Sequence, residues 1–69
     1  MEWMQIQLNG ETKRFPRSLT LQQLLDNLTI PAGRVACEVN LKIIQRAAYA
    51  ATPLREGDTI EIIQAIGGG

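Results

Sequence analysis

The sequence lacks histidine altogether and contains only one cysteine, Cys37, among its 69 residues. Because histidine is the usual general base near neutral pH and the commonest metal ligand, its absence argues against acid–base catalysis and against a metal site. A single cysteine excludes an intramolecular disulfide. Cys37 lies in the hydrophobic run VACEV without a basic neighbour to stabilise a thiolate, so we expect a core residue and not a redox or sulfur-handling thiol.

Charge of one sign, aromatic side chains and long hydrophobic runs are equally scarce. Seven basic residues balance seven acidic residues, and aromatics make up 4% of the chain. Without a cationic patch or a platform for base stacking, we expect no binding to nucleic acid and no electrostatic binding to a membrane. The amino-terminal residues do not form a signal peptide, and no apolar stretch approaches the ~20 residues of a membrane helix. We therefore expect a cytoplasmic protein.

The polar residues offer few candidates for catalysis. Ser18 is the only serine, and without histidine it has no evident base, so we interpret it as a loop residue. Glu56, Asp58 and Glu61 form the densest acidic group, which could hold a metal ion or act as an acid–base pair. Glu56 and Asp58 flank a glycine in a predicted turn, however, and Glu61 should point away from the neighbouring isoleucines. We favour a solvated edge that faces a basic partner, and we predict no catalytic or metal-binding residue.

What the sequence does contain is a set of clear local patterns, the first of which predicts a β-hairpin. Met4, Ile6 and Leu8 alternate with other residues in WMQIQL, the period-two pattern of a strand with one buried face. An Asn-Gly pair follows at residues 9–10, and these two residue types accept the positive φ angles of a type I′ turn. The run ETKRF then returns as a second strand that ends at Pro16.

The segment SLTLQQLLDNL predicts the main helix. Thr20 is a good N-cap residue, and Gln23 three positions later completes a capping-box pattern. The leucines that follow Thr20 recur at spacings of three and four residues, which places them along one stripe of a helix. This stripe consists of Leu21, Leu24, Leu25 and Leu28. We expect it to pack against a sheet.

The remaining segments predict three more strands. RVACEVN and KII form the third and fourth, with a bend at Asn40-Leu41, and TIEIIQAI forms the last strand after the turn REGD. AAYAATPL contains Pro53 and is expected to be irregular or a single turn. The pattern favours an α+β fold in which one main helix packs across one face of a mixed sheet of four to five strands. If the first and last strands are parallel neighbours, the arrangement is a β-grasp, the ubiquitin-like fold.

The chain ends in three glycines that follow the last strand directly. At ~3.3–3.6 Å per residue, three extended glycines reach about 10 Å and fit a channel that excludes side chains. The terminal carboxylate, with a pKa of about 3.5, is ionised at neutral pH and could attack the α-phosphate of ATP. From the tail alone, a disordered end or a truncated linker is an equally good interpretation. The union of the tail with a β-grasp pattern favours the activated carboxylate, with residues 1–66 as the β-grasp domain and 67–69 as a flexible tail.

The whole chain resembles the ThiS family, the sulfur carrier proteins of thiamin biosynthesis, which are β-grasp proteins that end in Gly-Gly. LNGE, the leucine helix, VACEVN, LREGDTIEII and the terminal GGG carry the resemblance. It implies that a ThiF-type enzyme adenylates Gly69, that a sulfur donor such as a cysteine desulfurase converts it to a thiocarboxylate, and that a ThiG-type thiazole synthase uses the sulfur. Gly67 and Gly68 would thread the partners' active sites. ATP and magnesium would belong to the activating enzyme, so the chain is expected to be a carrier without a cofactor of its own and not an enzyme.

Three other functions remain open at this stage. The small subunit of molybdopterin synthase, MoaD, uses the same chemistry but is generally longer. A ubiquitin-like modifier would join the carboxylate to a lysine of a target protein. A noncovalent binding module would use its sheet alone and would be indifferent to deletion of the tail.

The last strand also suggests where a partner docks. Ile60 and Ile62 share one parity, so if they face the helix, Ile63 lies on the open face of the sheet immediately before the tail. Ile63, Ala65 and Ile66 would then form an apolar partner interface beside the reactive terminus. Single exposed apolar residues are common on protein surfaces, so exposure of Ile63 would not by itself establish this role.

Overall fold

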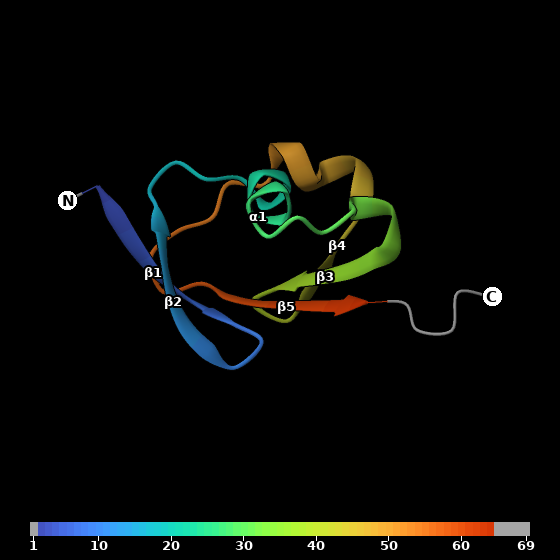
Figure 1. Ribbon diagram of the computed structural model, residues 1–69. Coiled ribbons are helices and arrows are strands. Elements are labelled where there is room, and N and C mark those ends of the chain that lie inside the picture. Colours follow the sequence, from blue (N-terminus) through green and yellow to red (C-terminus); the bar gives the residue numbers. More distant parts are fainter. Residues whose placement is uncertain (1, 65–69) are drawn as a thin grey trace.

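The computed structural model describes residues 2–64, in which a mixed sheet lies under a helix (Figure 1). The five strands are β1 (Trp3–Leu8), β2 (Glu11–Pro16), β3 (Val35–Val39), β4 (Lys42–Ile44) and β5 (Thr59–Gln64), in the sheet order β2-β1-β5-β3-β4. The helix is α1 (Leu21–Asn27), and two 3₁₀ segments are η1 (Ala32–Arg34) and η2 (Arg46–Ala51). The predicted α+β class with a β-grasp sheet is confirmed.

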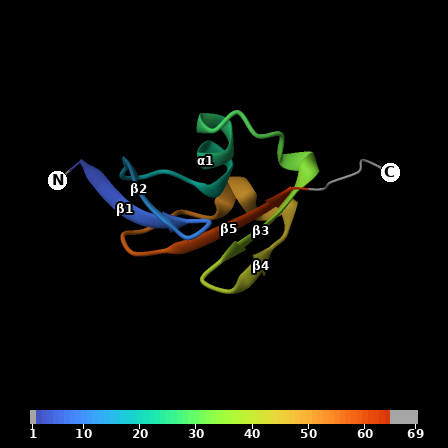
Figure 2. The same ribbon diagram turned by 60° about the horizontal axis from the view of Figure 1, so that its bottom comes forward.

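The first and last strands lie side by side at the centre of the sheet. Gln7 pairs with Thr59 and Leu8 with Ile60 in a parallel ladder. β2 pairs with the outer edge of β1 in an antiparallel hairpin. On the other side, β3 pairs with β5, and β4 forms a second antiparallel hairpin with β3 (Figure 2). Parallel strands need a long crossover connection, and the segment that carries α1 supplies it.

Both hairpins turn on a pair of residues with positive φ angles. Asn9 and Gly10 have φ angles of 50° and 84°, and Asn40 and Leu41 have φ angles of 53° and 70°. Positive φ at both central residues is the requirement of a type I′ turn, whose twist matches that of the strands. The Asn9-Gly10 turn was predicted from its residue types. The second turn places a leucine in the left-handed region, which is costly for a residue with a large side chain.

Helix α1 has a defined start and a defined end. The Gln23 N–H donates to Thr20 Oγ1 at 3.1 Å, and the Thr20 N–H donates to Gln23 Oε1 at 2.9 Å, so the predicted capping box is present. At the other end, Thr29 adopts a φ of 59°. The N–H groups of Thr29 and Ile30 donate to the carbonyls of Asp26 and Leu25, the bonding pattern of a Schellman motif. Because of this motif the last leucine of the predicted stripe is the C-cap residue and not a helical one.

The core lies between α1, η2 and one face of the sheet. The three helical leucines of the predicted stripe, the alternating residues of β1, and Cys37 are all buried, as expected. The prediction of irregular structure or a single turn for AAYAATPL holds around Pro53 but was wrong for the first part of the segment, because residues Arg46–Ala51 form the 3₁₀ segment η2 and insert Tyr49 into the core with 2% of its surface exposed. The core consists of Met4, Ile6, Leu8, Phe15, Leu21, Leu24, Leu25, Cys37, Tyr49, Leu54, Ile60 and Ile62.

Candidate functional site

The candidate site is the carboxyl-terminal end of β5, where the strand leads into the glycine tail. On one edge β5 is paired with β3 as far as its last described residue, with Val35 opposite Gln64 and Ala36 opposite Ile63. This end of the sheet lies beside η1 (Figure 2). Five residues of the predicted site lie outside the described residues: Ala65, Ile66, Gly67, Gly68 and Gly69. The predicted boundary between the domain and the tail, after residue 66, lies outside them as well.

On the other edge, a side chain continues the pairing after β1 has ended. The Asn9 N–H donates to the carbonyl oxygen of Ile60 at 2.9 Å, and the chain then turns away. The Ile62 N–H donates to Asn9 Oδ1 at 2.8 Å, and Asn9 Nδ2 donates to the Ile62 carbonyl oxygen at 3.4 Å. The Asn9 carboxamide therefore acts as one further rung of the ladder. The sequence suggested Asn9 only as a turn residue, and no local pattern indicated this second contact.

The start of β5 is organised by the turn REGD. Asp58 Oδ2 accepts a hydrogen bond from the Arg55 N–H at 2.8 Å, and Glu56 Oε1 accepts one from the Gln5 N–H at 2.9 Å. Asn40 Nδ2 donates to Asp58 Oδ1 at 3.0 Å. Carboxylates that accept such bonds fix the backbone, so these two have local structural partners in addition to solvent exposure. Within residues 2–64 no group of three metal-ligating side chains comes together.

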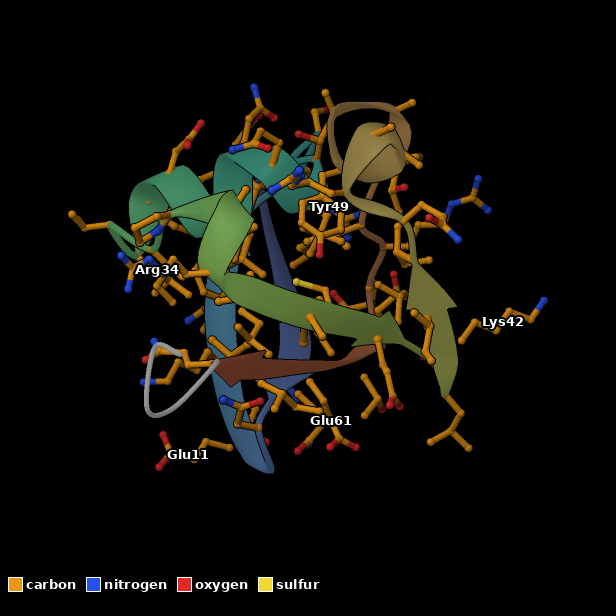
Figure 3. All side chains as sticks on the ribbon, turned by 90° about the vertical axis from the view of Figure 1, so that its right-hand side faces the viewer. Glu11, Arg34, Lys42, Tyr49 and Glu61 are labelled. Carbon is orange, nitrogen blue, oxygen red and sulfur yellow. The ribbon has the colours of Figure 1, made fainter. Side chains whose placement is uncertain are left out.

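The two faces of β5 differ as its residue parity predicts. Ile60 and Ile62 are buried against the helix side, whereas Ile63 is 54% exposed on the open face. Glu61 has the same parity and points away from α1 (Figure 3). The exposure of Ile63 is confirmed, while its role as a partner interface, together with Ala65 and Ile66, stays a prediction.

Shallow grooves converge on Gln64 from three sides. Arg34 lines two of these grooves and is the one basic residue among the described residues that line the three (Figure 3). The third runs along the helix side of the strand end and includes Asn9, Leu28 and Ile30. Among the described residues that line these grooves, no nucleophile is paired with a base.

The single thiol lies elsewhere, in the core. Cys37 is completely buried, and burial raises its pKa above the ordinary value, with a hydrogen bond from Tyr49 as a smaller, opposing effect. Burial also raises the pKa of Tyr49 to about 12. A protonated, inaccessible thiol is neither a nucleophile nor a metal ligand, so the predicted packing role of Cys37 is confirmed.

These features define a small β-grasp domain of the ubiquitin-like class, in which the central strand β5 is held on both edges. No helix among residues 2–64 has the length and apolar character needed to cross a membrane. The model of the ThiS family matches residues 6–69, and the chain belongs to this family. The family indicated by the sequence motifs is therefore confirmed.

Known proteins agree with this assignment. A thiamine biosynthesis protein (ThiS) from Geobacter metallireducens has a crystal structure similar to this chain, with a TM-score of 0.83 and 32% identity over 96% of this chain and 100% of that one. Two proteins named thiazole synthase contain similar segments of 66 residues, with 39% identity in Paramagnetospirillum magneticum and 41% in Magnetococcus marinus. The match covers 96% of this chain but 20% of each thiazole synthase, so the chain spans about a fifth of their length.

Proposed function

We propose that this chain is a sulfur carrier of thiamin biosynthesis that works through the carboxylate of Gly69 and is a co-substrate of other enzymes, not an enzyme itself. The observation that carries the proposal is the combination of a ThiS-family β-grasp domain with a central strand that runs into three terminal glycines. Residues 67–69 serve as a flexible thread, and residues 1–66 as the domain that partners recognise. The domain works in the cytoplasm.

The chemistry follows from the carboxylate. One of its oxygens attacks the α-phosphorus of ATP, pyrophosphate leaves, and an acyl adenylate forms in the active site of a ThiF-type enzyme. A sulfur nucleophile at the oxidation level of sulfide then adds to the acyl carbon and AMP leaves, so that sulfur replaces one carboxylate oxygen. ATP and magnesium bind to the activating enzyme, and a donor such as a cysteine desulfurase supplies the sulfur as a persulfide, which a thiol reductant converts to the level of sulfide with formation of a disulfide. Gly67 and Gly68 pass through channels too narrow for side chains.

A thiazole synthase of the ThiG type is the proposed acceptor of the sulfur. Support comes from the two proteins named thiazole synthase, each of which contains a segment similar to almost the whole of this chain. Two modules that are joined in one polypeptide in some organisms commonly act together when they are separate. The proposed interface for these partners consists of Ile63, Ala65 and Ile66.

The intact mass of the chain tests the proposal directly. Incubation with a ThiF-type enzyme, ATP, magnesium and hydrosulfide should raise the mass by the difference between a sulfur atom and an oxygen atom, and omission of ATP should abolish the change. An unchanged mass, together with no ATP–pyrophosphate exchange, would contradict the carrier function. Adducts on lysines of other proteins in a cell extract would instead identify a ubiquitin-like modifier.

Deletion of Gly69 should separate the fold from the function. No core residue lies beyond Ile62 in the described part of the chain, so the circular dichroism spectrum and the urea midpoint should match those of the parent. ATP–pyrophosphate exchange should fall severely, because the carboxylate no longer reaches the nucleotide. Gly68→Ala is the companion variant, since it keeps the length of the tail and adds one Cβ. Normal exchange by the deletion variant would rule out activation at the terminus.

A further inference from the structure

Two asparagine side chains bind the backbone of β5, Asn40 at the first residue of the strand, Thr59, and Asn9 at Ile62, closer to the tail. Both lie in type I′ turns with nearly equal φ angles, 50° for Asn9 and 53° for Asn40. Asn40 Oδ1 accepts from the Thr59 N–H at 2.9 Å, and Asn9 Oδ1 accepts from the Ile62 N–H at 2.8 Å. Each carboxamide also donates one hydrogen bond, Asn40 to Asp58 and Asn9 to the Ile62 carbonyl. The two residues therefore have the same conformation and similar bonds but different distances from the tail.

The Asn9 carboxamide replaces a stretch of backbone that the sheet lacks. Alternate residues of β5 direct their N–H and carbonyl groups toward β1, and the bonds from Gln7 to Asp58 and from Asn9 to Ile60 belong to this series. The next position in the series is Ile62, where β1 has already turned away. The carboxamide binds both the N–H and the carbonyl of Ile62 and so extends the paired length of β5 toward Gln64.

The contact between Asn9 and Ile62 lies two residues before the end of β5, on the side of the tail. Without it, β5 beyond Ile60 would be paired along β3 alone, and a strand end with one open edge frays more readily. From Ile62 to Gly69 the chain can reach at most about 23 Å at ~3.3 Å per residue, so the last residue that is held on both edges of β5 sets the point from which the tail can reach. Misplacement of a reacting group by ~1 Å can reduce a rate by about a hundredfold.

We propose that Asn9 is a positioning residue for the reactive terminus: its carboxamide holds β5 at Ile62 and thereby fixes the point from which the flexible tail extends into a partner's active site. This inference rests on the proposed function for its consequence and on the described hydrogen bonds for its mechanism. Asn9 also lines the groove beside Gln64, so it occupies the junction between the folded domain and the tail. Ile63, on the opposite side of β5, is not part of this contact.

The test compares Asn9→Gly with Asn40→Gly. Glycine tolerates the positive φ angle at both positions, so neither substitution strains the turn. Each variant loses one carboxamide and the two hydrogen bonds that it makes. The substrate is the full chain, and the measurement is ATP–pyrophosphate exchange by a ThiF-type enzyme over a range of carrier concentrations. We expect Asn9→Gly to lower kcat about tenfold with KM nearly unchanged, because the docking face remains intact. Asn40→Gly should stay within about twofold of the parent.

Two further measurements distinguish positioning from a general loss of stability. Amide hydrogen exchange at Ile62 should accelerate in Asn9→Gly and not in Asn40→Gly, independently of any partner. Asn9→Asp retains the oxygen that accepts from Ile62 at 2.8 Å and should recover most of kcat. Equal losses of kcat in both glycine variants, or unchanged Ile62 exchange in Asn9→Gly, would overturn the proposal. If the parent chain is not activated at all, the proposed function fails, and the positioning role fails with it. Amide hydrogen exchange would in that case still show whether the Asn9 side chain holds β5 at Ile62.

Discussion

At the scale of single residues, the most informative pair is Cys37 with Tyr49. Cys37 comes from β3 and Tyr49 from η2, and both are buried. Burial raises the pKa of both groups, and the interaction between the two side chains lowers the pKa of the thiol and raises that of the tyrosine hydroxyl. Tyr49 points from η2 toward the sheet (Figure 3). The buried side chain of Tyr49 therefore holds this alanine-rich segment against the core.

The buried pair makes stability sensitive to alkaline pH. Burial raises the pKa of Cys37 above 9.0 and that of Tyr49 from 10.0 to about 12. The unfolded chain releases these protons at lower pH than the folded chain, so their contribution to stability is complete below the unfolded pKa values and is lost as pH rises. We expect the urea midpoint to fall between about pH 9 and 12.

Tyr49→Phe isolates the tyrosine part of this effect. The variant lacks the hydroxyl proton, so its urea midpoint should fall less steeply than that of the parent between pH 10 and about 12. All other side chains are common to both proteins, so the difference between the two curves isolates the contribution of Tyr49. Parallel curves throughout this range would show that ionisation of Tyr49 is not linked to folding.

At the scale of elements, α1 is short and depends on its ends and on its buried face. Its seven residues are too few for a stable isolated helix in water. The capping box at Thr20 and Gln23 and the Schellman motif at Thr29 satisfy backbone groups at both ends. The three buried leucines then supply the hydrophobic contribution that retains the helix on the sheet.

Leu24→Ala should therefore destabilise the domain strongly. Leu24 has no exposed surface, and truncation of a buried leucine typically costs about 2 to 5 kcal/mol, a large part of the stability of a small domain. The measurement is the urea midpoint. Asn27→Ala, at an exposed position of the same helix, is the matched control and should change the free energy of unfolding by less than about 0.5 kcal/mol. A midpoint equal to the parent's for Leu24→Ala would show that this face is not packed.

At the scale of the whole molecule, the two faces of the sheet have different tasks. One face packs under α1 and η2, and the other is open and carries exposed apolar residues, of which Ile43 is 75% and Ile63 54% exposed. Glu38 and Glu61 lie opposite each other on this open face, and like charges in that position are unfavourable within the sheet. If the open face is the partner interface, as we propose, its combination of apolar and acidic residues predicts a partner surface that is apolar and basic.

Ile63→Asp should weaken partner binding and leave stability nearly unchanged. Ile63 contributes little to the core, so the melting temperature should stay close to that of the parent. Calorimetric titration with a ThiF-type enzyme or a thiazole synthase should show a loss of affinity, because a charge replaces an apolar contact beside the tail. Leu41→Asp is the control, since Leu41 is 81% exposed in the β3–β4 turn, at the other end of the sheet from Gln64. Undiminished affinity of Ile63→Asp would remove this residue from the interface.

Much of the fold could be predicted from the sequence because it is encoded locally. The alternation around Ile6, the capping box of α1 and the Asn9-Gly10 turn each involve residues within a few positions of one another, and each was found from residue types and spacing. The parity of β5, and with it the exposure of Ile63, follows from the pleat of any strand. The family resemblance rests on the same local motifs.

The tertiary structure alone decided which distant residues complete the site. The rung between Asn9 and Ile62 joins residues 53 positions apart, and the bond from Gln5 to Glu56 joins residues 51 positions apart. No residue near Asn9 in the sequence predicts that its carboxamide binds β5. The contact forms only when β1 and β5 pair as parallel strands. The burial of Tyr49 has the same origin, since its segment lacks a periodic pattern and is held by the core it covers. Local chemistry thus determined the elements, and the pairing of β1 with β5 determined which distant residues meet at the end of β5.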